Sequence, residues 1–159
     1  MRSANCDSGE AWLLVEAKAN IEELRSSCKA TPHGGRPLIE ACLALTRQRL
    51  GVAADREWLS GYYQPCNRLA VLDLQNEHGA PAHLLNIYFV GDRSGPGRSC
   101  PQDAAGWKPA LRDMEEHIGL PSTHHLAARV HKLFLSACDE AGARESTKEQ
   151  ATEGEAAAA

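Results

Sequence analysis

Glu16 and Lys18 are the two residues whose chemistry and spacing stand out. They lie in the otherwise apolar segment AWLLVEAKA, residues 11–19. Side chains two apart on a β-strand point to the same face, so a strand here places them side by side. An unpaired buried charge costs on the order of several kcal/mol, so the pair needs a reason. Two interpretations are open: a partly buried ion pair, or a metal ligand beside a lysine that activates water.

Elements on either side of this pair must position it. The apolar run itself is typical of a central strand buried on both faces. A short helical turn is expected at Ile21–Ser26, with Asn20 as its N-cap. Helical spacing from Pro37 predicts a helix that ends at Gly51. A second helix carries residues 66–74, with Pro65 in its first turn and 58–64 as a separate segment; a kinked helix from Trp58 is the alternative.

The second half of the chain continues the alternation of strand and helix. Alternating side chains predict a strand at His83–Val90. Apolar residues at helical spacing predict a helix from Trp107 to Ile118, ended by Gly119. The segment Leu126–Ala137 fits a helix or a strand equally. Residues 1–10 show no periodicity and are expected to be loosely ordered, 11–138 form one α/β domain, and 139–159 form a disordered tail.

Composition limits the classes of function. The net charge of −4 comes from the tail, which holds six acids and two bases, so the body is neutral. A neutral body does not indicate nucleic-acid binding by bulk charge, although a local patch that includes Arg36 and Arg68 would suffice. Six cysteines without a C-x-x-C pair, no signal peptide and no apolar run of about 20 residues favour a cytoplasmic chain with free thiols and no membrane span. Cys42 and Cys66 are expected to be buried.

Longer phrases carry a family resemblance. The segment WLLVEAKA at 12–19 resembles the (D/E)-x-K strand of PD-(D/E)XK nucleases. Together with GYYQPCNRLA at 61–70, IYFVGD at 87–92 and RVHKLFL at 129–135, it resembles a family of uncharacterised bacterial proteins with that nuclease-like fold. The resemblance covers residues 11–135. It implies a small mixed central sheet flanked by helices, in a restriction-endonuclease-like core that is shortened at its N-terminus.

The resemblance also implies a site. Glu16 and the carbonyl of Ala17 would ligate Mg²⁺ or Mn²⁺, Lys18 would position the attacking water, and Gln64 would complete the site for hydrolysis of DNA. The family's upstream acid is not obvious: Asp7 is the candidate and Glu10 a poorer substitute. Either the chain is a shortened member or its start is not the natural one. A non-catalytic member that acts as a binding or structural domain is the alternative, and a homo-oligomer stays open in both cases.

Overall fold

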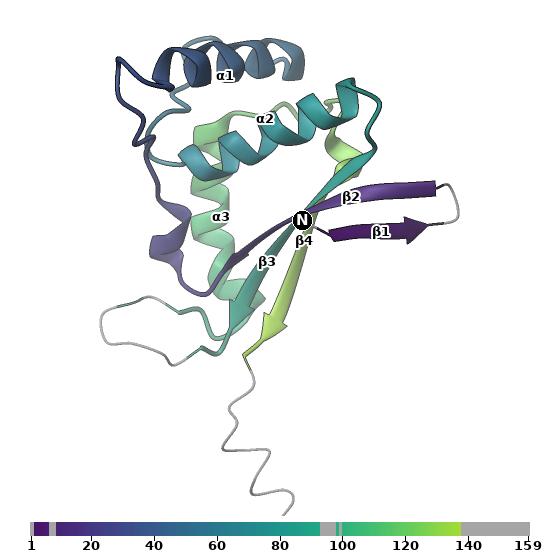
Figure 1. The fold of residues 1–159 in the computed structure, drawn as a ribbon. Helices are drawn as coiled ribbons and strands as arrows, with labels where there is room; N and C mark the ends of the chain where they lie inside the picture. Colours follow the sequence, from purple (N-terminus) through teal and green to yellow (C-terminus); the bar gives the residue numbers. More distant parts are fainter. Residues whose placement is uncertain (1, 7–8, 93–97, 99, 138–159) are drawn as a thin grey trace, which may run out of the picture.

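A single mixed sheet organises the molecule. The computed structural model describes residues 2–6, 9–92, 98 and 100–137. Its strands lie in chain order across the sheet (Figure 1): β1 Arg2–Cys6, β2 Gly9–Lys18, β3 Ala82–Val90 and β4 Val130–Ser136. The hairpin β1–β2 is antiparallel, whereas β2, β3 and β4 run parallel. The fold is therefore α/β with a small mixed sheet, as the sequence predicts.

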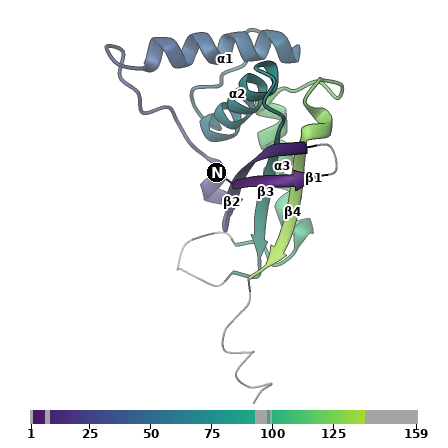
Figure 2. The same ribbon diagram turned by 45° about the vertical axis from the view of Figure 1, so that its right-hand side comes forward.

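Helices connect the parallel strands and cover one face of the sheet. They are η1 Ile21–Leu24, α1 Arg36–Leu50, α2 Tyr63–Glu77, α3 Ala104–Ile118 and η2 Ala127–Arg129. α2 and α3 pack on the sheet, and α1 lies on the outer side of α2 (Figure 2). Among the described residues, no helix has both the length and the apolar character that crossing a bilayer requires.

Local signals explain where these helices begin and end. The side chain of Asn20 accepts a hydrogen bond from the backbone of Glu23 and caps η1. Gly51 ends α1 with a φ of 72°, a conformation that glycine adopts at little cost. α2 begins at Tyr63, which leaves Pro65 in the first turn, where its missing N–H is harmless. The prediction of a separate segment before α2 is confirmed, and a continuous helix from Trp58 is not found.

Two segments differ from what the sequence alone allowed. Residues before Ala11 were expected to be loosely ordered, but Arg2–Cys6 pair with β2 as a hairpin strand. The segment Leu126–Ala137, open between helix and strand, forms the short turn η2 and then β4. Pairing with Leu84 to Val90 of β3 decides for the strand, and no local pattern reports such a partner. Asp7 and the predicted tail from 139 onward lie outside the described residues.

The core lies between the sheet and the helices α2 and α3. Its large members include Leu72, Trp58 and Trp107. Trp107 Nε1 donates to the carbonyl of Phe89 at 2.9 Å, and Trp58 Nε1 donates to that of Ile118 at 3.0 Å. These two bonds link both ends of α3 to its surroundings, because a buried indole N–H requires an acceptor. The position of α3 over β3 and β4 is thereby fixed.

Two predictions of burial are wrong. β2 was expected to be buried on both faces, but Val15, on the face away from the helices, is 50% exposed. The apolar run was read correctly as a strand, yet among the described residues no element covers that second face. Cys66 is fully buried as predicted, whereas Cys42 is exposed on α1. Helical spacing placed Cys42 on the inner face of α1, but the elements that pack on this helix leave Cys42 exposed.

Candidate functional site

Glu16 and Lys18 lie side by side at the C-terminal end of β2, on the face that α2 covers. Lys18 Nζ is 2.9 Å from Glu16 Oε1 and donates to Gln64 Oε1 at 2.8 Å. The second oxygen of Glu16 accepts a hydrogen bond from Arg68 Nε at 2.8 Å. We call these four residues, Glu16, Lys18, Gln64 and Arg68, the cluster. It joins a strand and a helix whose members are about 50 residues apart in the chain.

The chain on both sides of the cluster is fixed by side chains. After Lys18, Glu23 accepts hydrogen bonds from the backbone N–H of Ala19 and the amide of Asn20, and Asn20 is almost fully buried. On the helical side, the hydroxyl of Ser26 accepts from the backbone N–H of Gln64 at 2.8 Å. These bonds satisfy backbone groups that would otherwise be unpaired at the strand end and at the start of α2. The reach from Gln64 to Lys18 is therefore set by two anchored segments.

Burial and two neighbouring cations shift the pKa of Glu16 in opposite directions. Burial raises the pKa of this carboxyl group, but hydrogen bonds and charge attraction from Lys18 and Arg68 lower it by more, so it lies below the ordinary 4.5. The side chains of Glu16 and Lys18 are 14% and 9% exposed, and that of Arg68 is 36% exposed. One carboxylate thus faces two cations, and the cluster carries a net positive charge at neutral pH. Such a cluster attracts anions.

Neighbouring strands extend the polar face. Asn86 on β3 lies opposite Glu16, and Lys132 on β4 lies opposite Asn86, so the three form a row on one face. Lys132 forms an ion pair with Glu115 of α3. In the next row, Tyr88 lies beside Lys18. Burial, followed by the charges of Glu115 and Glu16, raises the pKa of Tyr88 well above its usual range, so its phenol stays protonated.

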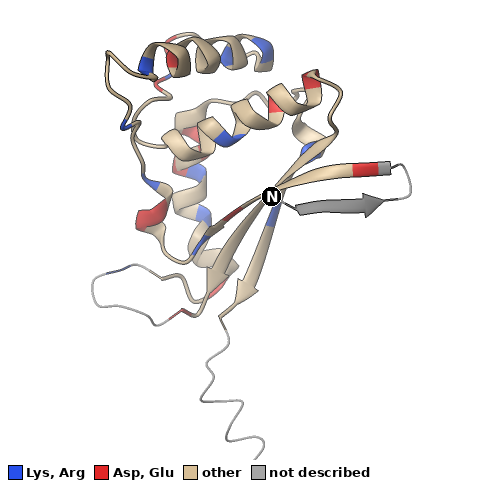
Figure 3. Cartoon of the chain, in the orientation of Figure 1, with Lys and Arg blue, Asp and Glu red and all other residues tan. Residues whose placement is uncertain are grey.

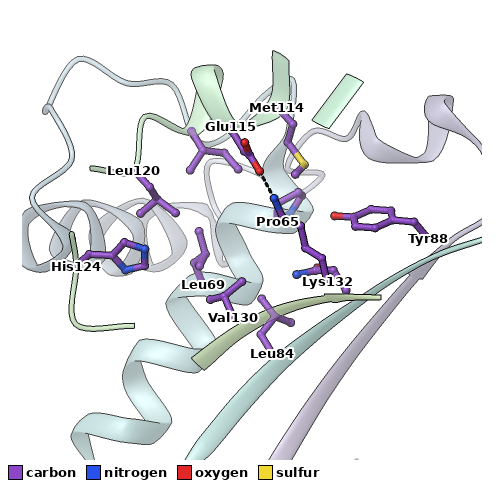
Figure 4. Close-up of a pocket in the computed structure, with 12 residues that line it drawn as sticks. Pro65, Leu69, Leu84, Tyr88, Met114, Glu115, Leu120, His124, Val130 and Lys132 are labelled. Carbon is purple, nitrogen blue, oxygen red and sulfur yellow. Dashed lines mark hydrogen bonds and ion pairs between the residues drawn. The ribbon is translucent and has the colours of Figure 1, made fainter. Parts of the chain in front are cut away.

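A cavity of about 260 Å³ opens beside this row, between the sheet, α2 and α3 (Figure 4). Its walls are mainly apolar, with Leu69, Leu84 and Met114 among them. Figure 4 shows His124 and Tyr88 at opposite ends of the cavity. Burial, and to a lesser extent the charge of His125, lowers the pKa of His124, so its ring is neutral at pH 7. Its Nδ1 atom is buried without a hydrogen-bond partner among the described residues, and such an atom favours a bound molecule or water.

A wider groove lies on the other side of Gln64. It encloses about 770 Å³ and is lined by the segment 25–30 together with Ile39, Tyr63 and Gln64. Two cations, Arg25 and Lys29, belong to this lining, and the guanidinium of Arg25 lies 4.6 Å from the centre of the Tyr62 ring. Gln64 is therefore the member of the cluster that also lines a groove with basic walls. Grooves lined by cations can bind the phosphate backbone of a nucleic acid.

The structure brings together four residues singled out from the sequence and separates others. Glu16, Lys18 and Gln64 are in contact as predicted, and Arg68 binds Glu16 directly. Arg36 lies at the start of α1 and pairs with Glu40. Glu10 is exposed six residues before Glu16 on the same strand, about 20 Å away at the usual rise per residue. Asp7 lies outside the described residues.

Other His, Cys, Asp and Glu side chains of the described residues form pairs and not larger groups. His125 pairs with the buried Asp73 at 2.7 Å, and His131 contacts His83 at 3.0 Å. Within the described part of the chain, no three His, Cys, Asp or Glu side chains are grouped as a metal site would require. For the cluster itself, this leaves Glu16 as the carboxylate and Gln64 as the amide oxygen.

Comparisons with known proteins add no relative: no protein-family model, curated protein or solved structure matches this chain. Function is therefore inferred from the geometry of the cluster and the hollows beside it.

Several residues near the cluster were missed at the level of sequence. Asn86 and Lys132 become neighbours of Glu16 only through the register of β3 and β4. The sequence did contain a signal for Arg25 and Lys29 as candidate binding residues, because both follow the C-terminal end of a predicted strand. Ligands of open parallel sheets bind at that edge. No sequence signal pointed to Glu115, because its position over the sheet depends on how α3 packs.

Proposed function

We propose that the cluster is the catalytic centre of a metal-dependent nuclease that hydrolyses phosphodiester bonds in DNA. The contact of Lys18 with both Glu16 and Gln64 carries the proposal. The resemblance to PD-(D/E)XK nucleases implies an acid and a lysine two residues apart on a strand, joined by a glutamine from a helix later in the chain, which here is α2. The hairpin before this strand and the parallel strand after its helix agree with such a core.

The cluster offers the smallest number of oxygen donors that a hard dication would accept. Mg²⁺ keeps several waters and is often held by one or two carboxylates together with substrate phosphate. Glu16 supplies one carboxylate, and Gln64 supplies an amide oxygen close to it. Arg68 pairs with one oxygen of Glu16, so Glu16 would hold a metal only with Arg68 turned toward solvent, where its side chain is already 36% exposed. Asp7 is the second acid that the sequence predicts, but Cys6 before it pairs with Gly9, seven residues from Glu16 along β2, so no described strand places it at the cluster.

Each residue of the cluster then has a role. A bound metal would offset phosphate charge and make a coordinated water more acidic. Lys18 places a fixed positive charge where the phosphate gains negative charge, and its low exposure strengthens that interaction. Gln64 orients the lysine ammonium group through one hydrogen bond. Arg68, released from Glu16, holds a non-bridging phosphate oxygen, which suits a guanidinium.

The flanking hollows suit a nucleic acid strand. The groove with Arg25 and Lys29 offers cations to the phosphates next to the cluster. The cavity beside Asn86 has apolar walls and an unpaired ring nitrogen at its far end, so it offers room for a sugar or a base. The scissile phosphate would then lie between the two hollows, over the cluster.

A second candidate is a non-catalytic domain that binds phosphates without a metal. One observation favours it: both oxygens of Glu16 already have cationic partners, and no described carboxylate joins Glu16 in the cluster. In this case Lys18 and Arg68 are held for an anion, and Glu16 only positions them. Metal-free binding of DNA that weakens steeply with salt separates this candidate from the first.

The proposal is tested by incubating the chain with single- and double-stranded DNA in Mg²⁺ or Mn²⁺. We expect cleavage that EDTA stops, because the phosphate charge must be offset by a metal. Glu16→Ala is expected to abolish cleavage because Glu16 is the carboxylate of the cluster, while Glu10→Ala serves as the control because Glu10 is remote from Glu16. An inactive wild-type chain with both metals and both substrates rejects the nuclease. Retained binding in that experiment supports the second candidate.

A further inference from the structure

One face of the parallel sheet is apolar and uncovered among the described residues. The strands β2, β3 and β4 turn alternate side chains away from α2 and α3. Val15 is 50% exposed on that face, Leu133 is 40% exposed and Leu135 is 38% exposed. None of the three packs against the core. Parallel sheets are found almost only with both faces covered, so the described part of the chain leaves this face without a layer.

The composition of this face limits what covers it. In register across the three strands it presents ten residues: Leu13, Val15, Ala17, His83, Leu85, Ile87, Phe89, His131, Leu133 and Leu135. None of them is Lys, Arg, Asp or Glu, and the strand β3 is uncharged along its whole length (Figure 3). A charged partner surface would therefore find no countercharge here. The face is complementary to another uncharged, apolar sheet surface.

We propose that a second copy of this chain covers the face, so that the two sheets pack against each other around a twofold axis. A twofold contact brings the same patch of both copies together, which requires a surface without like-charge repulsion. These ten residues meet that requirement. Two sheets packed in this way lie about 10 Å apart with interleaved side chains. The cluster faces α2 on the opposite side, so this dimer leaves it accessible and does not depend on the proposed nuclease activity.

The area of the face indicates the strength of the dimer. The three strands β2, β3 and β4 are about 14 Å wide, and seven residues are about 23 Å long, which gives a projected area of about 330 Å² per copy. Both copies together bury about 660 Å², which is below the roughly 1,000 Å² of stable specific interfaces and typical of weak ones. We therefore expect a weak dimer with a dissociation constant of about 100 μM, with monomer and dimer in exchange.

Sedimentation velocity of the full chain from about 1 to about 200 μM tests the proposal. The wild type is expected to shift from monomer to dimer over this range. Val15→Asp and Leu133→Asp, on two different strands, are each expected to raise the dissociation constant at least tenfold, because each buries two charges at the twofold contact. Leu45→Asp is the matched control: this leucine is 54% exposed on α1, away from the face, and its variant should associate like the wild type.

Circular dichroism at low concentration shows whether Val15→Asp and Leu133→Asp are folded. We expect both variants to fold, because the two replaced side chains are exposed in the monomer. A wild type that stays monomeric at about 200 μM overturns the proposal, and so does a dimer that both charged variants leave intact. A dimer that only Leu45→Asp dissociates places the interface on α1 and overturns it as well.

Discussion

Replacing Lys18 and Arg68 by methionine, singly and together, measures how two cations share one buried carboxylate. Lys18 contacts Glu16 Oε1 at 2.9 Å and Gln64 at 2.8 Å, and it is almost fully buried. Arg68 contacts the other oxygen of Glu16 at 2.8 Å from a more exposed position. Methionine keeps the approximate volume of the lysine stem, so Lys18→Met removes the charge without a large cavity.

The two single variants are expected to differ. A hydrogen bond to a charged group contributes about 1.5 to 3 kcal/mol, but removing Lys18 also removes the cost of burying its ammonium group. Because Glu16 keeps Arg68, we expect Lys18→Met to lower the free energy of unfolding by about 1 to 3 kcal/mol. Arg68→Met breaks a pair that solvent screens, and we expect a loss below about 1 kcal/mol.

The double variant is expected to lose more free energy of unfolding than the two single variants together. In each single variant one cation still neutralises Glu16, whereas in the double variant a carboxylate that is 14% exposed has no positive partner. We expect a coupling free energy of about 1 kcal/mol or more, since residues that share a charge network do not act additively. Urea denaturation at pH 7, at one protein concentration and with unchanged m-values, supplies the four free energies.

Additivity within about 0.5 kcal/mol would refute this reasoning, because independent sites behave in that way. So would a larger loss from Arg68→Met than from Lys18→Met, since the buried lysine would then not be the stronger partner of Glu16.

Three further predictions concern pH, the core and the thiols. Because the folded-state pKa of Glu16 lies below 4.5, its ionised form stabilises the fold above that pH and stops doing so as the pH falls through the folded-state pKa. The stability difference between wild type and Glu16→Gln should therefore be largest above pH 5 and shrink in more acidic urea titrations. Leu72→Ala should cost about 2 to 5 kcal/mol, because Leu72 is fully buried, whereas Leu74→Ala, 53% exposed on the same helix, should stay within about 0.5 kcal/mol in the same titrations. Burial raises the pKa of Cys66 to about 12, so at pH 8 mass spectrometry should find it alkylated far more slowly than the exposed Cys42, and equal rates would contradict its burial.

Elements with strong local signals were predictable from the sequence. The caps at Asn20, Gly51 and Gly119 depend on residues next to the helix ends, and each lies where local chemistry predicts. The placement of Glu16 and Lys18 on one strand face follows from the two-residue period of a strand. Their contact with Gln64 was expected only from the family resemblance.

Features that depend on tertiary packing were not predictable. The bond of Arg68 to Glu16 depends on how α2 lies over β2, which helical spacing does not report. β4 was undecided between helix and strand, because its partner strand begins more than 40 residues earlier. The exposed face of β2 is a further example: an apolar run indicates that a strand is buried, but it does not report what covers the strand.

The cleavage rate of Lys18→Ala, compared with that of Lys108→Ala, tests the proposed catalytic centre most directly. Lys108 is an exposed lysine of α3, so its replacement removes the same charge from the chain without touching the cluster. Both variants are first shown to be folded by circular dichroism, and single-turnover cleavage of DNA is then measured in Mg²⁺ and Mn²⁺. We predict wild-type cleavage by Lys108→Ala and a loss of at least a hundredfold, about 2.7 kcal/mol of transition-state stabilisation, for Lys18→Ala. Equal cleavage by the two folded variants would contradict the assignment of Lys18 to the reaction.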